Sequence, residues 1–205
     1  MNRHRIILFT VTALTALLAS CTATRKTSGN YSTTFTPKVT QPTNRSAVRV
    51  KISTGAQRIY VMEGNTVLLA SPCSVGTASD PTPQGSFRIL SKQFDRRRQS
   101  SPGAGYPMTY WMSFHSASYG MHWGFVKPYP CTHGCVRLPI RTAKAMFDLV
   151  SVGTPVHVAR SHAEDATVGA QMPLLDDTYM PDPPNSYMLS SQVFTDARNG
   201  KLYNF

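Results

Sequence analysis

The 205-residue sequence lacks several features that would assign it directly to a class of protein. It has no internal repeat, and its most apolar stretch, residues 6–18, is shorter than the roughly 20 residues that a membrane-spanning helix needs. It has no Cys-x-x-Cys pair of the kind that structural zinc sites use, so no metal site is expected. No cofactor is expected either. Acidic residues are scarce, with 10 against 21 basic residues. The chain is therefore strongly basic, with a formal net charge of +11.

The N-terminal residues have the pattern of a secretion signal. A short basic start is followed by the apolar stretch 6–18 and then by Leu18-Ala19-Ser20-Cys21. These four residues resemble a bacterial lipobox, which implies that residues 1–20 are cleaved and that Cys21 carries a lipid anchor. The alternative is an ordinary cleaved signal with a chance cysteine. We expect a lipoprotein that faces the periplasm, in the outer rather than the inner membrane because residue 22 is not Asp.

The charge of the exported chain indicates its partners. Cleavage after residue 20 removes Arg3 and Arg5, which leaves 19 basic residues against 10 acidic ones. A protein with this excess of positive charge is attracted to anionic lipid head groups and wall polymers. Nucleic acid is not an expected partner outside the cytoplasm.

Composition divides the remaining chain into three parts. Residues 21–46 are rich in Thr, Ser, Asn and Pro, and they are predicted to form a flexible tether behind the lipidated cysteine. Residues 47–160 contain the regular apolar patterns of a folded domain. Residues 161–205 combine proline and acidic residues without periodicity, and they are predicted to be an extended or disordered tail.

The folded domain is predicted to be mainly β. Residues 48–52 alternate apolar and polar side chains, as in a half-buried strand. Residues 59–62 and 67–70 flank Gly64-Asn65 and predict a hairpin. Further strands are expected at 86–90, 110–115 and 156–159. One helix is expected to begin at Pro139, because apolar residues then recur at helical spacing as far as Val150.

The run Cys131-Thr132-His133-Gly134-Cys135-Val136-Arg137 contains the parts of a thiol nucleophile. Gly134 allows the backbone to approach a substrate closely, and the helix after Cys135 would add a modest positive field if it pointed at the sulfur. Attack by the thiol also needs a base. His122 and His133 are both candidates, with His115 a more distant third, and spacing alone does not choose between them.

This run and four other segments resemble a single enzyme family. Thr132-His133-Gly134-Cys135 is similar to the Ser/Thr-His-Gly-Cys signature of the L,D-transpeptidase (YkuD-type) catalytic domain. The other similar segments, in chain order, are Gln57-Arg58-Ile59-Tyr60-Val61, Thr82-Pro83-Gln84-Gly85-Ser86-Phe87, Gly120-Met121-His122 and Gly153-Thr154-Pro155-Val156. Ordered matches across residues 48–159 are hard to obtain by chance, so the sequence is identified as a member of this family.

The resemblance implies a β-sandwich of the L,D-transpeptidase type, with one principal helix following the cysteine loop. By matching position, Cys135 is the nucleophile and His122 the general base. The remaining site positions that the resemblance implies, for the oxyanion and for substrate binding, are Gly134, His133, Arg137 and Trp123. Trp123 departs from the glycine that many members have after the histidine, which leaves the positioning of His122 open.

The implied reaction takes place on peptidoglycan stem peptides. The enzyme would form an acyl-enzyme with a tetrapeptide stem, release D-alanine and pass the acyl group to an amine. That amine would belong to a second stem peptide or to an envelope protein. Two alternatives share these residues: an L,D-carboxypeptidase that uses water as acceptor, and a peptidoglycan-binding lipoprotein without turnover.

Three further features have two interpretations each. Cys73 and Cys131 would form a disulfide or stay as two reduced thiols. The basic run 96–98 is interpreted as a solvated loop, although it could also attract stem-peptide carboxylates. Trp111 is interpreted as a packing residue or as part of a substrate groove.

Overall fold

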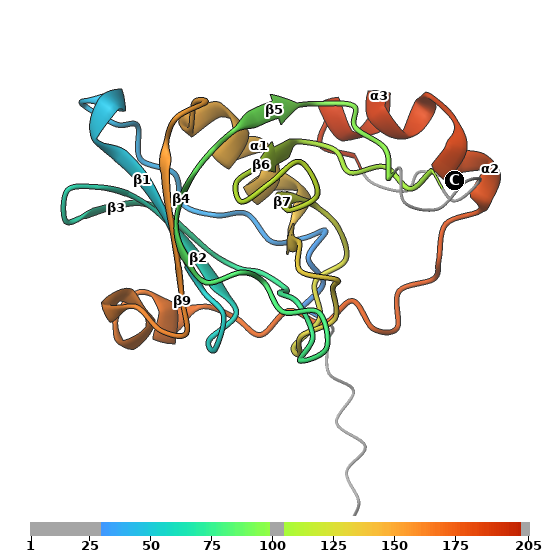
Figure 1. The fold of residues 1–205 in the computed structure, drawn as a ribbon. Helices are drawn as coiled ribbons and strands as arrows, with labels where there is room; N and C mark the ends of the chain where they lie inside the picture. The colour runs from blue at the N-terminus through green and yellow to red at the C-terminus, as the bar shows by residue number, and fades with distance from the viewer. Residues whose placement is uncertain (1–29, 99–104, 202–205) are drawn as a thin grey trace, which may run out of the picture.

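The computed structural model describes residues 30–98 and 105–201 (Figure 1). The predicted signal segment 1–20 and the predicted lipidation site Cys21 lie outside the described residues. Within the described ranges, no helix combines the length and the apolar composition that crossing a bilayer demands.

The larger of two sheets has five strands and contains the predicted hairpin. In spatial order its strands are β3 (Thr66–Pro72), β2 (Arg58–Glu63), β1 (Val48–Ser53), β9 (Pro155–Ala159) and β4 (Gly85–Arg88). The turn between β2 and β3 uses Gly64, whose φ of 56° lies in the left-handed region that glycine adopts readily. Strand β1 pairs with β2 and β9, and its Val50 and Ile52 are fully buried. The predicted alternation is confirmed.

The smaller sheet has four strands and carries the cysteine run. Its order is β5 (Ser91–Gln93), β6 (Trp111–Ser113), β7 (Gly120–Trp123) and β8 (Val136–Leu138). Strands β6 and β7 are antiparallel, whereas β7 and β8 are parallel. The strand predicted at 110–115 is shorter than expected, because Tyr110 has a φ of 58° and cannot continue an extended strand.

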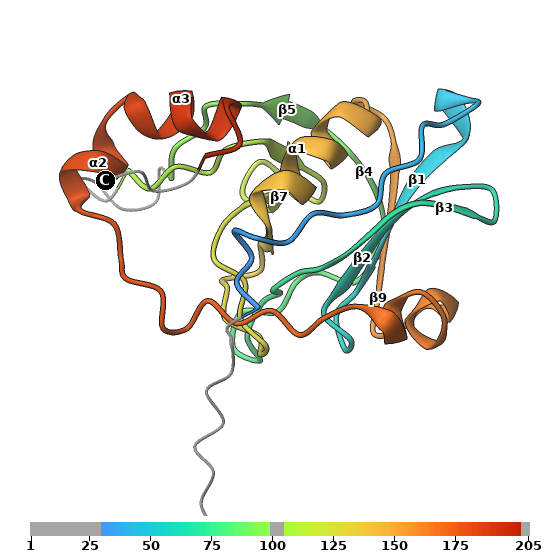
Figure 2. The ribbon, with the colours of Figure 1, turned by 180° about the vertical axis from the view of Figure 1, so that it is seen from behind.

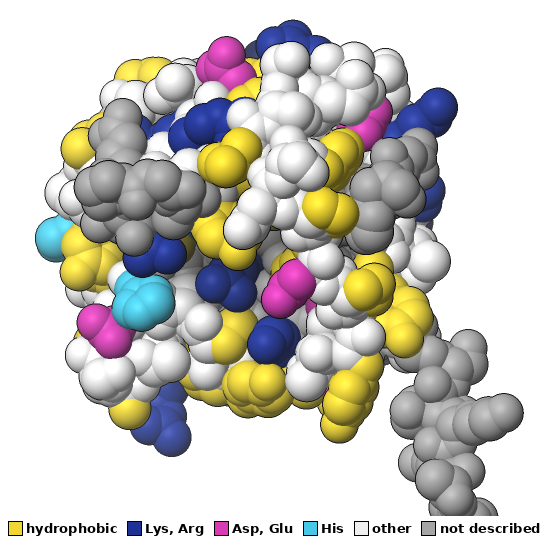
Figure 3. Space-filling view, turned by 90° about the vertical axis from the view of Figure 1, so that its right-hand side faces the viewer, with side chains coloured by type: hydrophobic (Ala, Val, Ile, Leu, Met, Phe, Trp, Pro, Cys, Tyr) yellow, Lys and Arg dark blue, Asp and Glu magenta, His cyan; other side chains and the backbone are white. Residues whose placement is uncertain are grey.

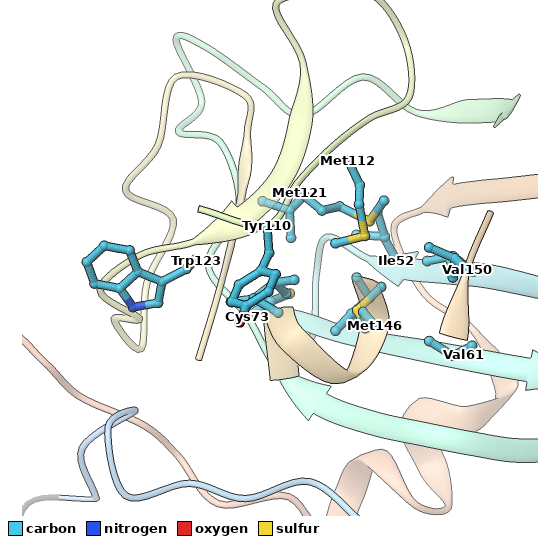
Figure 4. Packing of buried hydrophobic residues seen from close by; sticks show 14 of the residues in the cluster. Ile52, Val61, Cys73, Tyr110, Met112, Met121, Trp123, Met146 and Val150 are labelled. Atoms are coloured by element: carbon cyan, nitrogen blue, oxygen red, sulfur yellow. The ribbon is translucent and has the colours of Figure 1, made fainter. Parts of the chain in front are cut away.

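One apolar core joins the two sheets and helix α1 (Ile140–Leu149) (Figure 4). Side chains that are distant in the sequence meet there, including Ile52, Val61, Met112, Met121 and Met146. Helix α1 begins at Ile140, one residue later than predicted, and Pro139 is its N-cap. Two sheets around a core, with one principal helix after the cysteine run, confirm the predicted mainly β fold.

The structure contradicts the predicted extended or disordered tail 161–205 where helices form, whereas residues 173–184 have no regular secondary structure. The elements that form there are η2 (Ala163–Ala166), η3 (Gly169–Gln171), α2 (Asn185–Leu189) and α3 (Gln192–Arg198). Val193 and Ala197 of α3 are fully buried in the main core. They are four residues apart and so share one helix face. The contacts of α3 are with residues distant in the sequence, since the Tyr110 hydroxyl donates to the Ala197 carbonyl and Phe94 contacts Phe194.

The N-terminal segment is also packed where the structure describes it, contrary to the predicted tether 21–46. Val39 forms a bridge with Leu69, and the amides of Thr43 and Asn44 donate to the Glu63 carboxylate. Residues 45–47 form the short helix η1 (Arg45–Ala47). Figure 2 shows this N-terminal segment in blue. The C-terminal segment, in orange to red, runs from η3 beside the larger sheet to α2 and α3 at the opposite end of the domain.

Candidate active site

Strands β7 and β8 bring the candidate nucleophile and base together. They are parallel neighbours, with His122 in register with Arg137. Side chains alternate along an extended chain, so Cys135, two residues before Arg137, points to the same side of the sheet as Arg137 and His122. The register places Cys135 beside Gly120, two residues along β7 from His122, so a separation of 13 residues in the sequence becomes a diagonal of roughly 8 Å between backbones.

The loop that carries Cys135 is held from inside by Thr132. The Thr132 hydroxyl donates to the Cys135 carbonyl at 2.6 Å and accepts from the Gly134 amide at 3.1 Å. Gly134 has a φ of 98°, and a Cβ there would lie 2.5 Å from the Tyr119 ring. Only glycine fits this position, because a side chain would be strained and would collide with Tyr119.

The Cys135 thiol is half-buried and is held in its protonated form. Its Sγ lies 3.6 Å from the Ser118 carbonyl oxygen, which can only accept a hydrogen bond. Burial raises the pKa of the Cys135 thiol, while a hydrogen bond with the Gly120 backbone and the charge of Arg137 act in the opposite direction. Burial has the larger effect on the pKa, so the resting group is a thiol. Helix α1, which was expected to supply a positive field at the sulfur, begins only after strand β8.

The imidazole of His122 is buried and neutral. Its Nδ1 lies 2.5 Å from the Trp123 carbonyl oxygen, so Nδ1 carries the proton and Nε2 keeps its lone pair. Burial lowers the pKa of His122 to about 4 despite this hydrogen bond, and the charges of Arg137 and Arg96 lower it further. A neutral ring with a free Nε2 can accept a proton from a thiol at neutral pH.

Trp111 and Arg96 form a stack beside the imidazole. The centres of the Trp111 and His122 rings are 5.8 Å apart, and the angle between the ring planes is 27°. The Arg96 guanidinium lies over the Trp111 ring, 4.3 Å from its centre. Arg96 also donates to the Ala117 carbonyl at 3.0 Å, in the turn that presents Ser118 to the thiol. Arg96 is therefore not a fully solvated loop residue, and Trp111, which is 1% exposed, is mainly a packing residue.

A cleft of about 760 Å³ opens beside these groups. The predicted site residues that line it are Cys135, His122, His133, Arg137 and Trp123. Gly134 is buried behind the cysteine, and His115 lies outside the lining, in edge contact with Phe87 and Tyr119. His133 is exposed, whereas His122 is 7% exposed. Figure 3 shows basic side chains gathered around a hollow on the face that carries α2 and α3.

Several residues of the cleft were not identified from the sequence. Ser118 and Tyr119 belong to an irregular turn without a recognisable motif. Asp182, Pro183 and Met188 come from the segment that was predicted to be extended or disordered. The prolines around Asp182 restrict the backbone and so indicate a stiff segment. The same composition is also typical of segments without regular structure, so it did not identify this wall of the cleft.

The two remaining described cysteines are free thiols. Burial raises the pKa of Cys73 to about 12, so this group stays protonated in the core. Cys131 accepts a long contact of 3.9 Å from Arg137 Nη1, which fixes the guanidinium beside the cleft. Of the two interpretations, the structure has the reduced pair.

The fold and the site together define a class of protein. A two-sheet β domain places a thiol and a neutral imidazole in one cleft, and cysteine-dependent acyl transfer uses such a pair of groups. Residues 47–158 match the family described as the L,D-transpeptidase catalytic domain, and the chain belongs to that family.

Individual relatives are similar over the same region. The YkuD protein of Bacillus subtilis is 29% identical over 115 residues, 54% of this chain and 65% of that protein. L,D-transpeptidase 1 of Mycobacterium tuberculosis is 32% identical over 123 residues, 52% of this chain and 48% of that protein. A solved structure described as the Ldtfm–avibactam carbamoyl enzyme has a TM-score of 0.50 and 26% identity, covering 57% of this chain and 50% of that chain. The match therefore spans about half to two thirds of these proteins.

Proposed function

We propose that the protein is a peptidoglycan L,D-transpeptidase. The observation that carries this proposal is the parallel pairing of β7 and β8, which puts His122 and Cys135 on one side of the sheet within a cleft of the family's catalytic domain. Membership of the family and similarity to L,D-transpeptidase 1 of M. tuberculosis support the reaction type.

In the proposed mechanism, Cys135 attacks the carbonyl carbon of the diamino acid in a tetrapeptide stem. His122 Nε2 takes the thiol proton as the carbon–sulfur bond forms. The Gly134 amide already donates to the Thr132 hydroxyl, so the backbone amide of Cys135 is the donor that we assign to the oxyanion. Collapse of the tetrahedral intermediate breaks the bond to D-alanine, whose amine leaves with the proton held by His122. Because the resting thiol and imidazole are both neutral, we expect proton transfer to accompany attack rather than precede it.

The second half of the reaction regenerates the thiol. The amine of a stem peptide, or of an envelope protein, attacks the thioester and loses a proton to His122, and the sulfur leaves and recovers that proton. Arg137 and His133 at the cleft, together with Trp123, contact the substrate or order its surroundings. Trp123 is only 2% exposed, so its contribution is mainly packing.

The experiment uses the full chain, purified in detergent, with tetrapeptide muropeptides and mass spectrometry of the products. Cross-linked dimers that are absent with Cys135→Ala would establish a transpeptidase. Release of D-alanine without dimers would favour the carboxypeptidase. If no product depends on Cys135, the proposal is wrong and a binding lipoprotein without turnover replaces it.

The place of action is a separate part of the proposal. Leu18-Ala19-Ser20-Cys21 supports cleavage after residue 20 and lipidation of Cys21, which would hold the domain at the periplasmic face of the outer membrane. Mass spectrometry of the N-terminal peptide should find a lipidated cysteine, and Cys21→Ser should move the protein from the membrane to the soluble fraction. An unmodified N-terminus in the wild-type protein would contradict the anchor.

A further inference from the structure

The C-terminal segment forms one wall of the cleft, although it lies outside the 47–158 region that defines the family. Asp182 and Pro183 line the cleft just before α2, and Met188 lines it from within α2. The residues of this wall follow the domain that the family shares. Their charge and shape can therefore influence which ligands this protein binds.

The wall is held rigidly at its α2 end. The Arg97 guanidinium donates to the carbonyl oxygens of Met188 and Ser190, both at 2.7 Å, and its bonds to two further carbonyls, at Gly105 and Leu189, are 2.9 and 3.1 Å long. The carbonyls of Met188, Leu189 and Ser190 lie at the C-terminal end of α2, where the helix itself leaves carbonyls without partners, so one side chain fastens α2 to the loop after β5.

The wall is also held at its other end, before Asp182. The buried carboxylate of Asp177 accepts from the amide and hydroxyl of Ser32 and from the amide of Val126, the last at 2.7 Å. Pro181, Pro183 and Pro184 restrict the backbone between the two fixed points. Asp182 is thus presented from a stiff segment rather than from a mobile loop.

The charges of the cleft are distributed unequally. Its cationic lining residues are Arg96, Arg98, Lys127 and Arg137. Among the described residues of the lining, Asp182 carries the one carboxylate. Within the described parts of the chain, this exposed carboxylate makes no hydrogen bond or ion pair. An unpaired acid on a stiff wall, facing a basic cleft, suits a ligand that carries a positive group as well as negative ones.

We propose that Asp182 binds the ammonium group of a stem-peptide side chain, while the basic residues of the cleft attract the carboxylates of the same peptide. This inference rests on the proposed function for the identity of the ligand. A diamino acid in the stem has a free side-chain amine, so Asp182 makes the protein select peptides in which that amine is unmodified. The C-terminal segment thereby acts as a specificity element of the site.

The test compares two tetrapeptides that differ only in whether the side-chain amine of the diamino acid is free or acetylated. Binding of each to the full chain carrying Cys135→Ala is measured by calorimetry, so that no turnover is needed. We expect the free-amine peptide to bind about tenfold more tightly, a difference typical of one partly desolvated ion pair. Adding Asp182→Asn should abolish this preference, and Asp182→Glu should retain part of it.

Asp148→Asn is the matched control. It removes the same charge from an exposed position on α1 that does not line the cleft, so the tenfold preference should persist. The inference is overturned if Asp182→Asn keeps the preference, if Asp148→Asn removes it, or if both peptides bind equally to the protein with Asp182 intact. The rate of Cys135 acylation by the free-amine peptide in the protein with Cys135 intact tests the proposed function separately. A binding preference without acylation would sustain the role of Asp182 and reject the transpeptidase.

Discussion

The buried, neutral imidazole of His122 predicts a specific loss of stability in acid. The ordinary pKa of histidine is 6.5, and burial lowers that of His122 to about 4. As the pH falls from 6.5 towards 4, His122 therefore becomes protonated in the unfolded chain while it stays neutral in the folded chain. The stabilising contribution of the neutral ring is fully present above pH 6.5 and is lost as the pH falls through this window.

The magnitude follows from the two pKa values. The full difference corresponds to about 3 kcal/mol, and the part lost between pH 7.5 and pH 4.5 is about 2.5 kcal/mol. His122→Gln cannot titrate, so it removes this term while leaving every carboxylate in place. The free energy of unfolding of the wild-type protein should therefore fall by about 2.5 kcal/mol more than that of His122→Gln over this pH range.

Urea denaturation of both proteins at pH 7.5 and pH 4.5 measures this double difference. A constant loss of packing or of the hydrogen bond to Trp123 cancels in the comparison, because it is present at both pH values. A double difference below about 0.5 kcal/mol would refute the reasoning, since it would mean that the ring titrates in the folded protein as it does in the unfolded chain.

Three other substitutions test the supports of the site. Gly134→Ala should lower the rate of Cys135 acylation about 100-fold, because the new Cβ collides with Tyr119 and displaces the cysteine loop; an unchanged rate would contradict this account of the loop. Asp177→Ala should lower the free energy of unfolding in urea by about 3 kcal/mol, since three buried donors lose a charged acceptor; a loss under about 1 kcal/mol would show that they find other partners. Arg96→Gln should shift the pH midpoint of iodoacetamide alkylation of Cys135 upward, because the Arg96 charge lowers the thiol pKa, whereas Arg96→Lys should shift it less; an identical midpoint in all three proteins would exclude an electrostatic role.

The sequence by itself determined the scaffold and the candidate reacting groups. Strand β1 and the β2–β3 hairpin were predictable because alternation and a Gly-Asn turn are local properties. Helix α1 was predictable to within one residue for the same reason. The run around Cys135 pointed to a thiol site because its residue types and order are distinctive.

Only the tertiary structure decided how those groups behave. Burial depends on neighbours that are distant in the sequence, so no local pattern could show that the pKa of Cys135 is raised or that His122 is neutral. The C-terminal segment was misjudged for a similar reason. Its order comes from Arg97, from Asp177 and from the core that receives Val193, and these are long-range contacts that composition does not record. The sequence therefore specified that the thiol and the imidazole are present. The packing of distant segments decided the protonation of these two groups and placed Asp182 in the wall of the cleft.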